Sequence, residues 1–460
     1  MISGSLSEWA AAMGGELRGP DGRFAGVSTD SRRRARGALF FALRGERYDG
    51  ADFVAAAAAG GASGAVLNGP SSEEVPQIIV RDTRGALADC ARAWRTRFDI
   101  PLIGITGSNG KTTVKALTAS ILRAEWGADA VLSSPRSFNN EVGLPVTLLE
   151  LSSRHRAAVL EFGASHPGDI GRLAEIARPT IGALLNASPA HLEGLEDVDR
   201  IAREKGALLS SLPPGGVGVI PAGTPFSGYW QGLLGSRKTL RFGGDGEFSA
   251  RNPRRINNGL CFELRCPEGE ARVAMRLIGA HNLRNALAAC ALAAAAGAGL
   301  AAMAEGLGAQ AAVAGRLQIH EAGAGVRVID DSYNANPASV SAAIGVLAGQ
   351  DGERWLVVGD MGELGPDSSG WHRRVGEEAR RAGVDRLYCA GRDSRRAAGA
   401  FGPQAVWREC VEDLCAVLRQ DLHGGVTALV KGSRFMAMER AVSALREAAS
   451  GLARENVNHV

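Results

Sequence analysis

Short apolar runs alternate with alanine-rich stretches over the first hundred residues of the chain. Consecutive apolar residues bounded by glycine or polar residues predict strands at 37–43, 64–67 and 77–80. Alanine-rich stretches predict helices at 51–59 and at about 84–97. Because proline disfavours helix in the residue before it, we expect a boundary at Asp99-Ile100-Pro101.

The middle of the chain continues this alternation of strands and helices. A strand that begins at Leu102 leads into a glycine-rich loop and a helix at about 111–125. Further strands are predicted at 157–160, 181–185 and 216–220. This order is typical of a parallel sheet with helical crossovers. Residues 240–278 differ, because their short alternating runs predict a small antiparallel insert, after which alanine-rich helices follow to about Val313.

A third unit begins at Gly315. Its predicted strands lie near 326–329, 355–358, 385–388 and 428–430, again separated by helices. At about 150 residues per domain, 460 residues suggest three domains. We therefore expect an α/β fold with an N-terminal α/β domain (1–99), a central doubly wound parallel sheet carrying the insert (100–314) and a Rossmann-like C-terminal domain (315–460).

The overall composition is typical of a soluble globular protein, with 45% hydrophobic and 22% charged residues. The net charge of +3 is too small to indicate a nucleic-acid or membrane-surface partner. Seven scattered cysteines without a CxxC pair favour free thiols in a reducing compartment. The first twenty residues lack the basic start and apolar run of a secretory signal, so a cytoplasmic protein is expected.

One uncharged stretch, from Ala286 to Ala304, has about the length of a membrane span. It consists mainly of alanine, which drives insertion weakly, and Gly297 and Gly299 interrupt it. We therefore predict a buried pair of helices broken at these glycines, and no stable membrane insertion.

Lysine is rare in this chain. Only five of the 52 basic residues are lysines, namely Lys111, Lys115, Lys205, Lys238 and Lys431. Because arginine serves wherever a general positive charge is enough, the remaining lysines could mark places that need a compact ammonium or a nucleophilic amine. The alternative is that a compositional bias left a few lysines at random.

A glycine-rich loop, Gly104-Ile-Thr-Gly-Ser-Asn-Gly-Lys-Thr-Thr113, lies between a predicted strand and a predicted helix. The pattern GxxxxGK[ST] would need glycine where the chain has Ile105, and the form present is the shorter Gly107-x-x-Gly-Lys-Thr. Backbone amides at such a turn cradle phosphates, with Lys111 placed for the β and γ oxygens and Thr112 for Mg²⁺. This predicts an ATP or GTP site; the alternative is a glycine turn before an ordinary helix.

Polar residues follow the neighbouring strands. Glu161 ends the strand at 157–160, and His191 lies in the loop after the next strand. Because ligands of parallel sheets bind beyond the carboxyl ends of the strands, these side chains could converge on the glycine loop. Taken singly, both signals are weak, since many strands end in glutamate and a loop histidine is usually solvated.

The third unit opens with Gly315-Arg316, and a strand there ends in Ile329-Asp-Asp-Ser-Tyr-Asn-Ala-Asn-Pro337. An acid at a strand end can bind ribose hydroxyls, and arginine suits bidentate contact with phosphate. The alternative is a polar turn that is rich in helix-capping residues.

Together these segments resemble the Mur ligase family over nearly the whole chain, and within it the branch that adds D-alanyl-D-alanine. The motifs that carry the resemblance are at 28–32, 40–50, 105–113, 137–145, 279–285, 330–337, 358–365 and 430–434. The resemblance implies an ATP-dependent ligase that joins UDP-N-acetylmuramoyl-tripeptide to D-alanyl-D-alanine through an acyl phosphate. It also implies an N-terminal domain that binds the UDP substrate, and a monomer.

The resemblance implies a role for each matching residue. Catalytic roles fall on Lys111, Glu161, His191 and Lys205. ATP-binding roles fall on Gly107, Ser108, Asn109, Gly110, Lys111, Thr112, Thr113, Asn282, Arg316 and Asp331. Substrate-binding roles fall on Ser28, Thr29, Asp30, Ser31, Arg32, Asn139, Asn140, Tyr333, Asn334, Asn336 and Lys431. Two Mg²⁺ ions would be held by Thr112, Glu161, His191 and Lys205, the last as a carbamate.

Three positions depart from the family pattern. Ala51 replaces a common histidine, Ala207 stands where glutamate is usual, and Pro221-Ala-Gly-Thr224 replaces an Asn-x-Asp-Asp string. Two other functions stay open at this point. One is another Mur or folylpolyglutamate-type ligase, which would share the phosphate and metal residues. The other is a P-loop ATPase or nucleotide switch, which would hydrolyse ATP without an acceptor.

Overall fold

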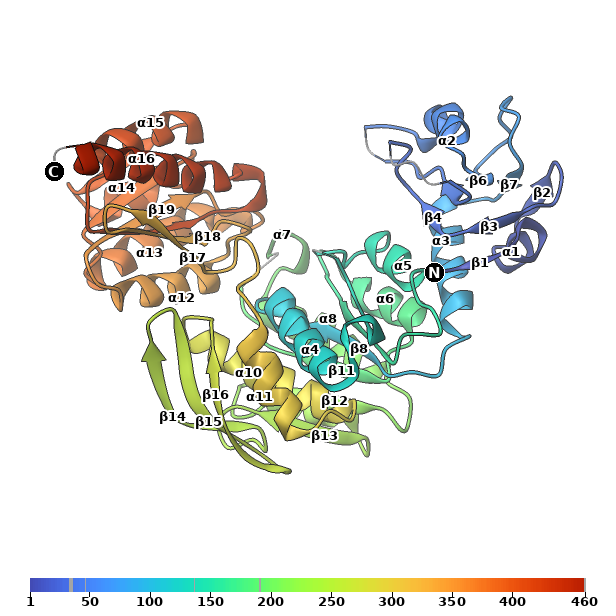
Figure 1. Cartoon of the computed structure of the whole chain (residues 1–460), viewed down its shortest axis with the longest axis horizontal. Helices are drawn as coiled ribbons and strands as arrows, with labels where there is room; N and C mark the ends of the chain where they lie inside the picture. Colours follow the sequence, from blue (N-terminus) through green and yellow to red (C-terminus); the bar gives the residue numbers. More distant parts are fainter. Residues whose placement is uncertain (33–35, 46, 136, 190–191, 459–460) are drawn as a thin grey trace.

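The computed structural model describes residues 1–460 except 33–35, 46, 136, 190–191 and 459–460. Three α/β units follow one another, with the N-terminal and C-terminal units on opposite sides of the central one (Figure 1). Each unit is built on a sheet of its own, of five, six and six strands. The predicted three-domain α/β fold is therefore confirmed.

The N-terminal unit has a five-stranded sheet in the order β2-β7-β6-β5-β4. These strands are β2 (Glu16–Arg18), β4 (Val27–Ser28), β5 (Leu39–Phe41), β6 (Gly64–Leu67) and β7 (Gln77–Ile79). A separate antiparallel pair joins β1 (Ser3–Ser5) and β3 (Arg23–Ala25). The helices are α1 (Leu6–Ala12), α2 (Val54–Ala59) and α3 (Thr83–Arg95). The helix predicted from 51 starts as a 3-10 turn, Gly50–Phe53, in which the Asp49 side chain accepts from the N–H of Ala51.

The central unit has a six-stranded, fully parallel sheet in the order β13-β12-β11-β8-β10-β9. Its strands are β8 (Leu102–Thr106), β9 (Val131–Ser133), β10 (Ala157–Glu161), β11 (Ile181–Leu184), β12 (Val217–Pro221) and β13 (Lys238–Phe242). Every residue of β8, β10 and β11 is buried, as expected for strands covered by helices on both faces.

Helices and a short insert complete the central unit. They are α4 (Lys111–Trp126), η2 (Ala128–Ala130), α5 (Gly143–Leu148), α6 (Asp169–Ala177), α7 (Leu192–Leu195), α8 (Val198–Ser210), α9 (Ser227–Leu234), α10 (Ala280–Ala295) and α11 (Leu300–Ala309). The antiparallel insert consists of β14 (Ser249–Ile256), β15 (Gly259–Cys266) and β16 (Gly269–Met275). The predicted start of this insert at 240 is wrong, because β13 pairs in parallel with β12 as the edge of the main sheet.

The uncharged stretch around Gly297 forms two helices, as predicted. The chain turns between α10 and α11, and both helices pack on α4. Within the described ranges, no helix combines the length and the apolar character that crossing a bilayer requires. All seven cysteines are free thiols.

The C-terminal unit has a six-stranded sheet in the order β17-β18-β22-β19-β20-β21, in which only the edge strand β17 is antiparallel. The strands are β17 (Gln318–Gly323), β18 (Val326–Asp331), β19 (Glu353–Gly359), β20 (Arg386–Ala390), β21 (Ala405–Arg408) and β22 (Val426–Lys431). The helices are α12 (Pro337–Ala348), η3 (Gly365–Asp367), α13 (Ser368–Arg381), α14 (Arg395–Phe401), α15 (Val411–Asp421), η4 (Arg434–Met436) and α16 (Glu439–Asn458). The sequence did not predict the edge strands β17 and β21.

Strand register in the central sheet brings three loops to one edge. Glu161 at the end of β10 lies beside Ile105 of β8, and Leu184 at the end of β11 lies beside Thr106. The segments that follow these three strands therefore start at the same level. This alignment fixes where a site can form.

The close packing of α11 on α4 gives a stability prediction. A Cβ added at Gly306 would lie 2.4 Å from Cα of Ile121, so we expect Gly306→Ala to lower the free energy of unfolding by about 1–3 kcal/mol. The matched control is Gly345→Ala in α12, where nothing lies within 4 Å of the added Cβ and alanine favours helix by up to about 1 kcal/mol. Denaturant unfolding measures both changes, and equal stability of the two variants would contradict this account of the packing.

Candidate active site

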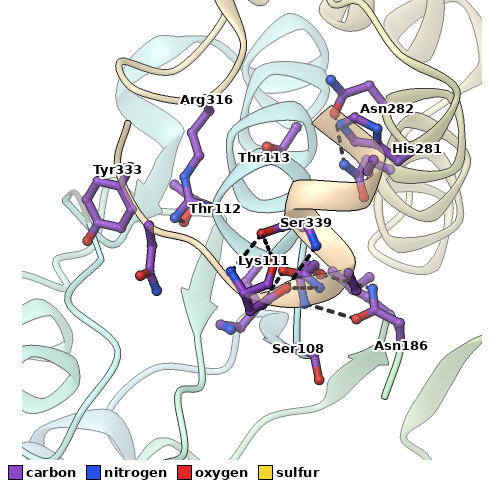
Figure 2. A pocket seen from close by; sticks show the side chains of 18 of the residues that line it. Ser108, Lys111, Thr112, Thr113, Asn186, His281, Asn282, Arg316, Tyr333 and Ser339 are labelled. Carbon is purple, nitrogen blue, oxygen red and sulfur yellow. Dashed lines mark hydrogen bonds between the residues drawn. The ribbon is translucent and has the colours of Figure 1, made fainter. Parts of the chain in front are cut away.

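A cavity of about 470 Å³ lies between the central and C-terminal units. Its central-unit lining comes from the glycine loop, the start of α4, the ends of β10 and β11, and the start of α10. Its C-terminal lining comes from Arg316, the segment after β18, the start of α12 and Lys431. Figure 2 shows side chains from these separate segments meeting around the first turn of α4.

The glycine loop ends in a backbone conformation that favours glycine. Gly110 has φ +88°, and a Cβ there would lie 2.6 Å from Oδ1 of Asn285. No side chain caps α4 at Gly110, so the first amides of the helix point towards the cavity without a capping acceptor. An uncapped helix start in a loop of this kind is suited to a phosphate group.

Hydrogen bonds to the loop after β11 hold the glycine loop in shape. The amide N–H of Asn109 donates to Oδ1 of Asn186 at 2.9 Å, and Nδ2 of Asn186 donates to the carbonyl of Asn109 at 3.0 Å. Ser108 Oγ donates to the carbonyl of Ser188 and accepts from its N–H. The sequence did not single out Asn186 or Ser188, although polar residues directly after a neighbouring strand were a usable signal.

Lys111, Thr112 and Glu161 form the centre of the site. Nζ of Lys111 donates to the carbonyl of Gly107 at 2.7 Å, and Oγ1 of Thr112 donates to Oε2 of Glu161 at 3.3 Å. Burial lowers the pKa of Lys111 to about 8; Glu161 opposes this shift and Arg316 adds to it. An anionic ligand would compensate this partly buried positive charge.

Glu161 is fully buried and has an ionic partner that sequence analysis did not assign. Nζ of Lys115 lies 2.9 Å from Oε1 of Glu161, and the Lys115 side chain is only 6% exposed. Lys115 follows Lys111 by four residues, so both lysines lie on one face of α4. This spacing, together with the scarcity of lysine, was the signal that could have identified it.

The residues present fit a magnesium ion. A hydroxyl oxygen from Thr112 and a carboxylate oxygen from Glu161 lie 3.3 Å apart, and Mg²⁺ prefers such oxygen ligands. No group of three or more His, Cys, Asp or Glu that could hold a metal occurs among the residues with described positions. Few protein ligands are expected where substrate phosphates and water complete the coordination. The predicted ligand His191 lies outside the described residues.

Lys205 in α8 is almost fully buried, with 1% exposure. Burial lowers the pKa of its amine to about 7; the positive charge of Lys111 lowers it further and Glu204 opposes the shift. Glu204 itself accepts hydrogen bonds from the N–H groups of Gly168 and Ile170 at the start of α6. Lys205 does not line the cavity, and its link to the site is its interaction with Lys111.

The C-terminal unit contacts the glycine-loop helix directly. Nη2 of Arg316 donates to Oγ1 of Thr112 at 3.3 Å, and its guanidinium lies over the ring of Tyr333, 4.4 Å from the centroid. The Tyr333 hydroxyl donates to Oγ of Ser137 at 2.7 Å. These contacts join the two units on one side of the cavity.

Asn336 makes a second connection between the units. Its Nδ2 donates to Oδ1 of Asn109 at 2.8 Å, and its Oδ1 accepts from the N–H of Ser339 as the cap of α12. Deeper in the C-terminal unit, Nζ of Lys431 lies 2.6 Å from Oδ2 of Asp331 and donates to the carbonyl of Asn334. The bond between Asn336 and Asn109 therefore joins the C-terminal unit to the central one.

Most of the predicted site residues lie in this cavity. Those that line it are Ser108, Asn109, Gly110, Lys111, Thr112, Thr113, Asn139, Glu161, Asn282, Arg316, Asp331, Tyr333, Asn334, Asn336 and Lys431. Gly107 contributes only its carbonyl to Lys111. Both polar atoms of the Asn282 side-chain amide form hydrogen bonds within the protein. Nδ2 donates to the carbonyl of Ile278, and Oδ1 accepts from Nδ2 of Asn285.

Two groups of predicted substrate residues lie elsewhere. Ser28 to Arg32 form a turn of the N-terminal unit, in which Asp30 accepts two hydrogen bonds from the Arg32 guanidinium. Ser28, Asp30 and Ser31 line a separate small cavity beside β5. Asn140 accepts from the N–H groups of Val142 and Gly143 near the start of α5, which is a structural capping role.

Family models match three consecutive parts of the chain. The model of the Mur ligase family catalytic domain matches residues 23–95, and that of the Mur ligase middle domain matches 105–293. The model of the Mur ligase glutamate ligase domain matches 315–434.

Individual relatives match nearly the full length. The UDP-N-acetylmuramoyl-tripeptide–D-alanyl-D-alanine ligase of Escherichia coli strain K12 is 40% identical over 97% of this chain and 99% of its own. A crystal structure of MurF from Acinetobacter baumannii matches over 97% of this chain and 99% of its own, with 31% identity and a TM-score of 0.91. The MurF ligase of Thermotoga maritima in complex with ADP covers 93% and 98%, with 26% identity and a TM-score of 0.83.

The two roles of Asn336 can be separated by substitution. Aspartate keeps the oxygen that caps α12 but replaces the donor to Asn109 with a negative charge beside the glycine loop. We expect the free energy of unfolding of Asn336→Asp to stay within about 0.5 kcal/mol of that of the parent. We expect the variant to bind ADP about tenfold more weakly than the parent does. Calorimetric titration and thermal unfolding measure the two effects. Unchanged ADP affinity in a stable variant would rule out this contact with the nucleotide loop.

Proposed function

This chain belongs to the Mur ligase family, and we propose that it joins D-alanyl-D-alanine to UDP-N-acetylmuramoyl-tripeptide at the expense of ATP. It is a ligase of peptidoglycan synthesis. The observation that carries this conclusion is the match to a relative of that name at 40% identity over 97% of the chain. The cavity supports it, because nucleotide-loop residues and C-terminal residues line one space.

The proposed reaction begins with attack of the tripeptide carboxylate on the γ-phosphorus of ATP, which breaks the bond to ADP and gives an acyl phosphate. The amine of D-alanyl-D-alanine then attacks the acyl carbon, loses a proton and displaces phosphate. Carboxylate and triphosphate repel each other, so positive charge must hold them in line. Lys111 and Arg316 are placed to supply it, with Mg²⁺ neutralising phosphate charge when bound.

Closure of the C-terminal unit has a chemical purpose in this proposal. An acyl phosphate hydrolyses in water, and a closed cavity protects it until the amine arrives. The contacts of Tyr333 with Ser137 and of Asn336 with Asn109 support such closure. Lys431 holds Asp331, and we assign this pair to the ribose side of the nucleotide.

The remaining ligand assignments are part of the same proposal. ATP phosphates bind at Gly107 to Thr113, adenine beside Asn282, and the first Mg²⁺ at Thr112 and Glu161. His191 and a carbamate on Lys205 would hold a second Mg²⁺. Burial and the lowered pKa of Lys205 support the carbamate, because only a neutral amine can attack carbon dioxide.

The substrate-binding assignments divide between the units. The UDP end of the substrate binds at Ser28 to Arg32, whereas its peptide end and the dipeptide bind near Asn139, Tyr333, Asn334 and Asn336. We retain domain boundaries at 99/100 and 314/315, a monomeric state and a cytoplasmic location as proposals. The location follows from the proposed use of ATP and a nucleotide-linked precursor.

An assay with each substrate omitted in turn tests the function. We expect phosphate release to require ATP, the UDP-linked tripeptide and D-alanyl-D-alanine together, because the acyl phosphate turns over only when the amine is present. The mass of the product should exceed that of the UDP-linked tripeptide by one D-alanyl-D-alanine residue. Steady phosphate release from ATP alone would instead favour an ATPase or switch, and turnover with a single amino acid would favour another ligase of the superfamily.

Replacement of Lys205 tests the carbamate. Alanine removes the only group there that can form it, so we expect Lys205→Ala to lose at least about 100-fold in kcat, comparable to losing a charged catalytic group. Added acetate or formate should restore part of this loss by supplying a carboxylate. Lys238→Ala, on the exposed part of β13, is the matched control. Full activity of Lys205→Ala without rescue would remove the carbamate from the proposal.

A further inference from the structure

Lys115 makes a buried connection that the proposed chemistry does not use. Its ammonium lies 2.9 Å from Oε1 of Glu161 and donates to the carbonyl of Ser134 at 2.7 Å. Glu161 is 0% exposed, so its charge is held inside the protein. The other oxygen, Oε2, accepts from Thr112 on the cavity side. The two carboxylate oxygens therefore have separate partners.

The described cavity lining carries an excess of positive charge. Its carboxylates are Glu161 and Asp331, whereas its basic side chains are Lys111, Arg284, Arg316 and Lys431. Lys431 is paired with Asp331, and Lys115 is paired with Glu161 from behind the lining. An excess of cations favours an anionic polyphosphate and disfavours a free divalent cation. The nucleotide phosphates would reverse this balance.

We propose that Lys115 is the resident counter-ion of Glu161, and that it keeps a divalent metal from binding before the nucleotide arrives. The inference rests on the proposed role of Glu161 as a metal ligand. Lys115 neutralises the buried carboxylate through Oε1 and leaves Oε2 directed at Thr112. Phosphates of the nucleotide would supply the negative charge that the lining lacks, so a metal would bind together with them. Lys115 acts through Glu161 and is a positioning residue.

A purely structural ion pair makes a different prediction. If Lys115 served only to fill space and tie α4 to β10, its loss would lower stability equally with or without metal. If it stands in for the metal, its loss leaves a buried carboxylate that a divalent cation can neutralise instead. Metal dependence of stability without nucleotide therefore separates the two roles.

The test compares thermal unfolding of the whole chain without nucleotide, in EDTA and in millimolar Mg²⁺ or Mn²⁺. We expect Lys115→Met, which keeps an unbranched chain but no charge, to melt several degrees below the parent in EDTA and to recover on adding metal. The parent and the control Lys238→Met should show no such dependence. Direct titration should give Mn²⁺ binding to Lys115→Met at least about tenfold tighter than to the parent.

A double variant keeps the test decisive if Lys115→Met does not fold in EDTA. Lys115→Met with Glu161→Gln has no buried charge to neutralise, so it should fold and melt independently of metal. The proposal would be overturned if Lys115→Met were destabilised by the same amount in Mg²⁺ or Mn²⁺ as in EDTA. It would also be overturned if the parent bound Mn²⁺ without nucleotide as tightly as Lys115→Met does.

Failure of the underlying site has a separate signature. Mg²⁺ should tighten ADP binding to the parent, and Glu161→Gln should lose most of that tightening. If ADP binds the parent equally with and without Mg²⁺, the assignment of Glu161 as a metal ligand fails, whatever Lys115→Met does. If the tightening is present in the parent but Lys115→Met shows no metal-dependent stability, only the counter-ion role of Lys115 fails.

Discussion

The site depends on holding several cations in a poorly hydrated space around one buried carboxylate. Lys111 and Lys115 are desolvated, and Glu161 is fully buried beside them. Such an arrangement lowers the stability of the protein, since charges lose hydration when they are buried. The fold tolerates it because α4, β10 and α8 are fixed by extensive apolar packing on the central sheet. In return, the cationic side chains interact strongly with phosphate, because the surrounding medium screens charge weakly.

The second requirement is that the C-terminal unit closes without becoming fixed. Its contacts at the cavity are a few hydrogen bonds, from Tyr333 to Ser137, from Arg316 to Thr112 and between Asn336 and Asn109. The apolar cores of the two units are largely separate clusters, so few apolar contacts are lost on opening. In the proposed reaction, such an arrangement would let substrates and product enter and leave between closed states that exclude water.

Local sequence patterns predicted the parts of the site that depend on short-range structure. The glycine loop, α4 and the buried strands follow from spacing within some twenty residues, and the resemblance identified the polar segment after β18. The spacing of Lys115 from Lys111 could have indicated that Lys115 faces the site, but its pairing with Glu161 joins residues 46 positions apart on different elements, so no local pattern specifies the partner. The edge strands β17 and β21 were missed because half-exposed residues leave no continuous apolar run.

Contacts between the units could not be predicted from the sequence, since they depend on how two separately folded units pack against each other. Their chemistry has a consequence for solution behaviour. The bonds from Tyr333 to Ser137 and from Asn336 to Asn109 join neutral partners, and the guanidinium of Arg316 bonds to a neutral hydroxyl, that of Thr112. Dissolved ions screen interactions between charges far more than those between uncharged groups. Raising the ionic strength should therefore leave the shape of the closed protein nearly unchanged while loosening its hold on the nucleotide.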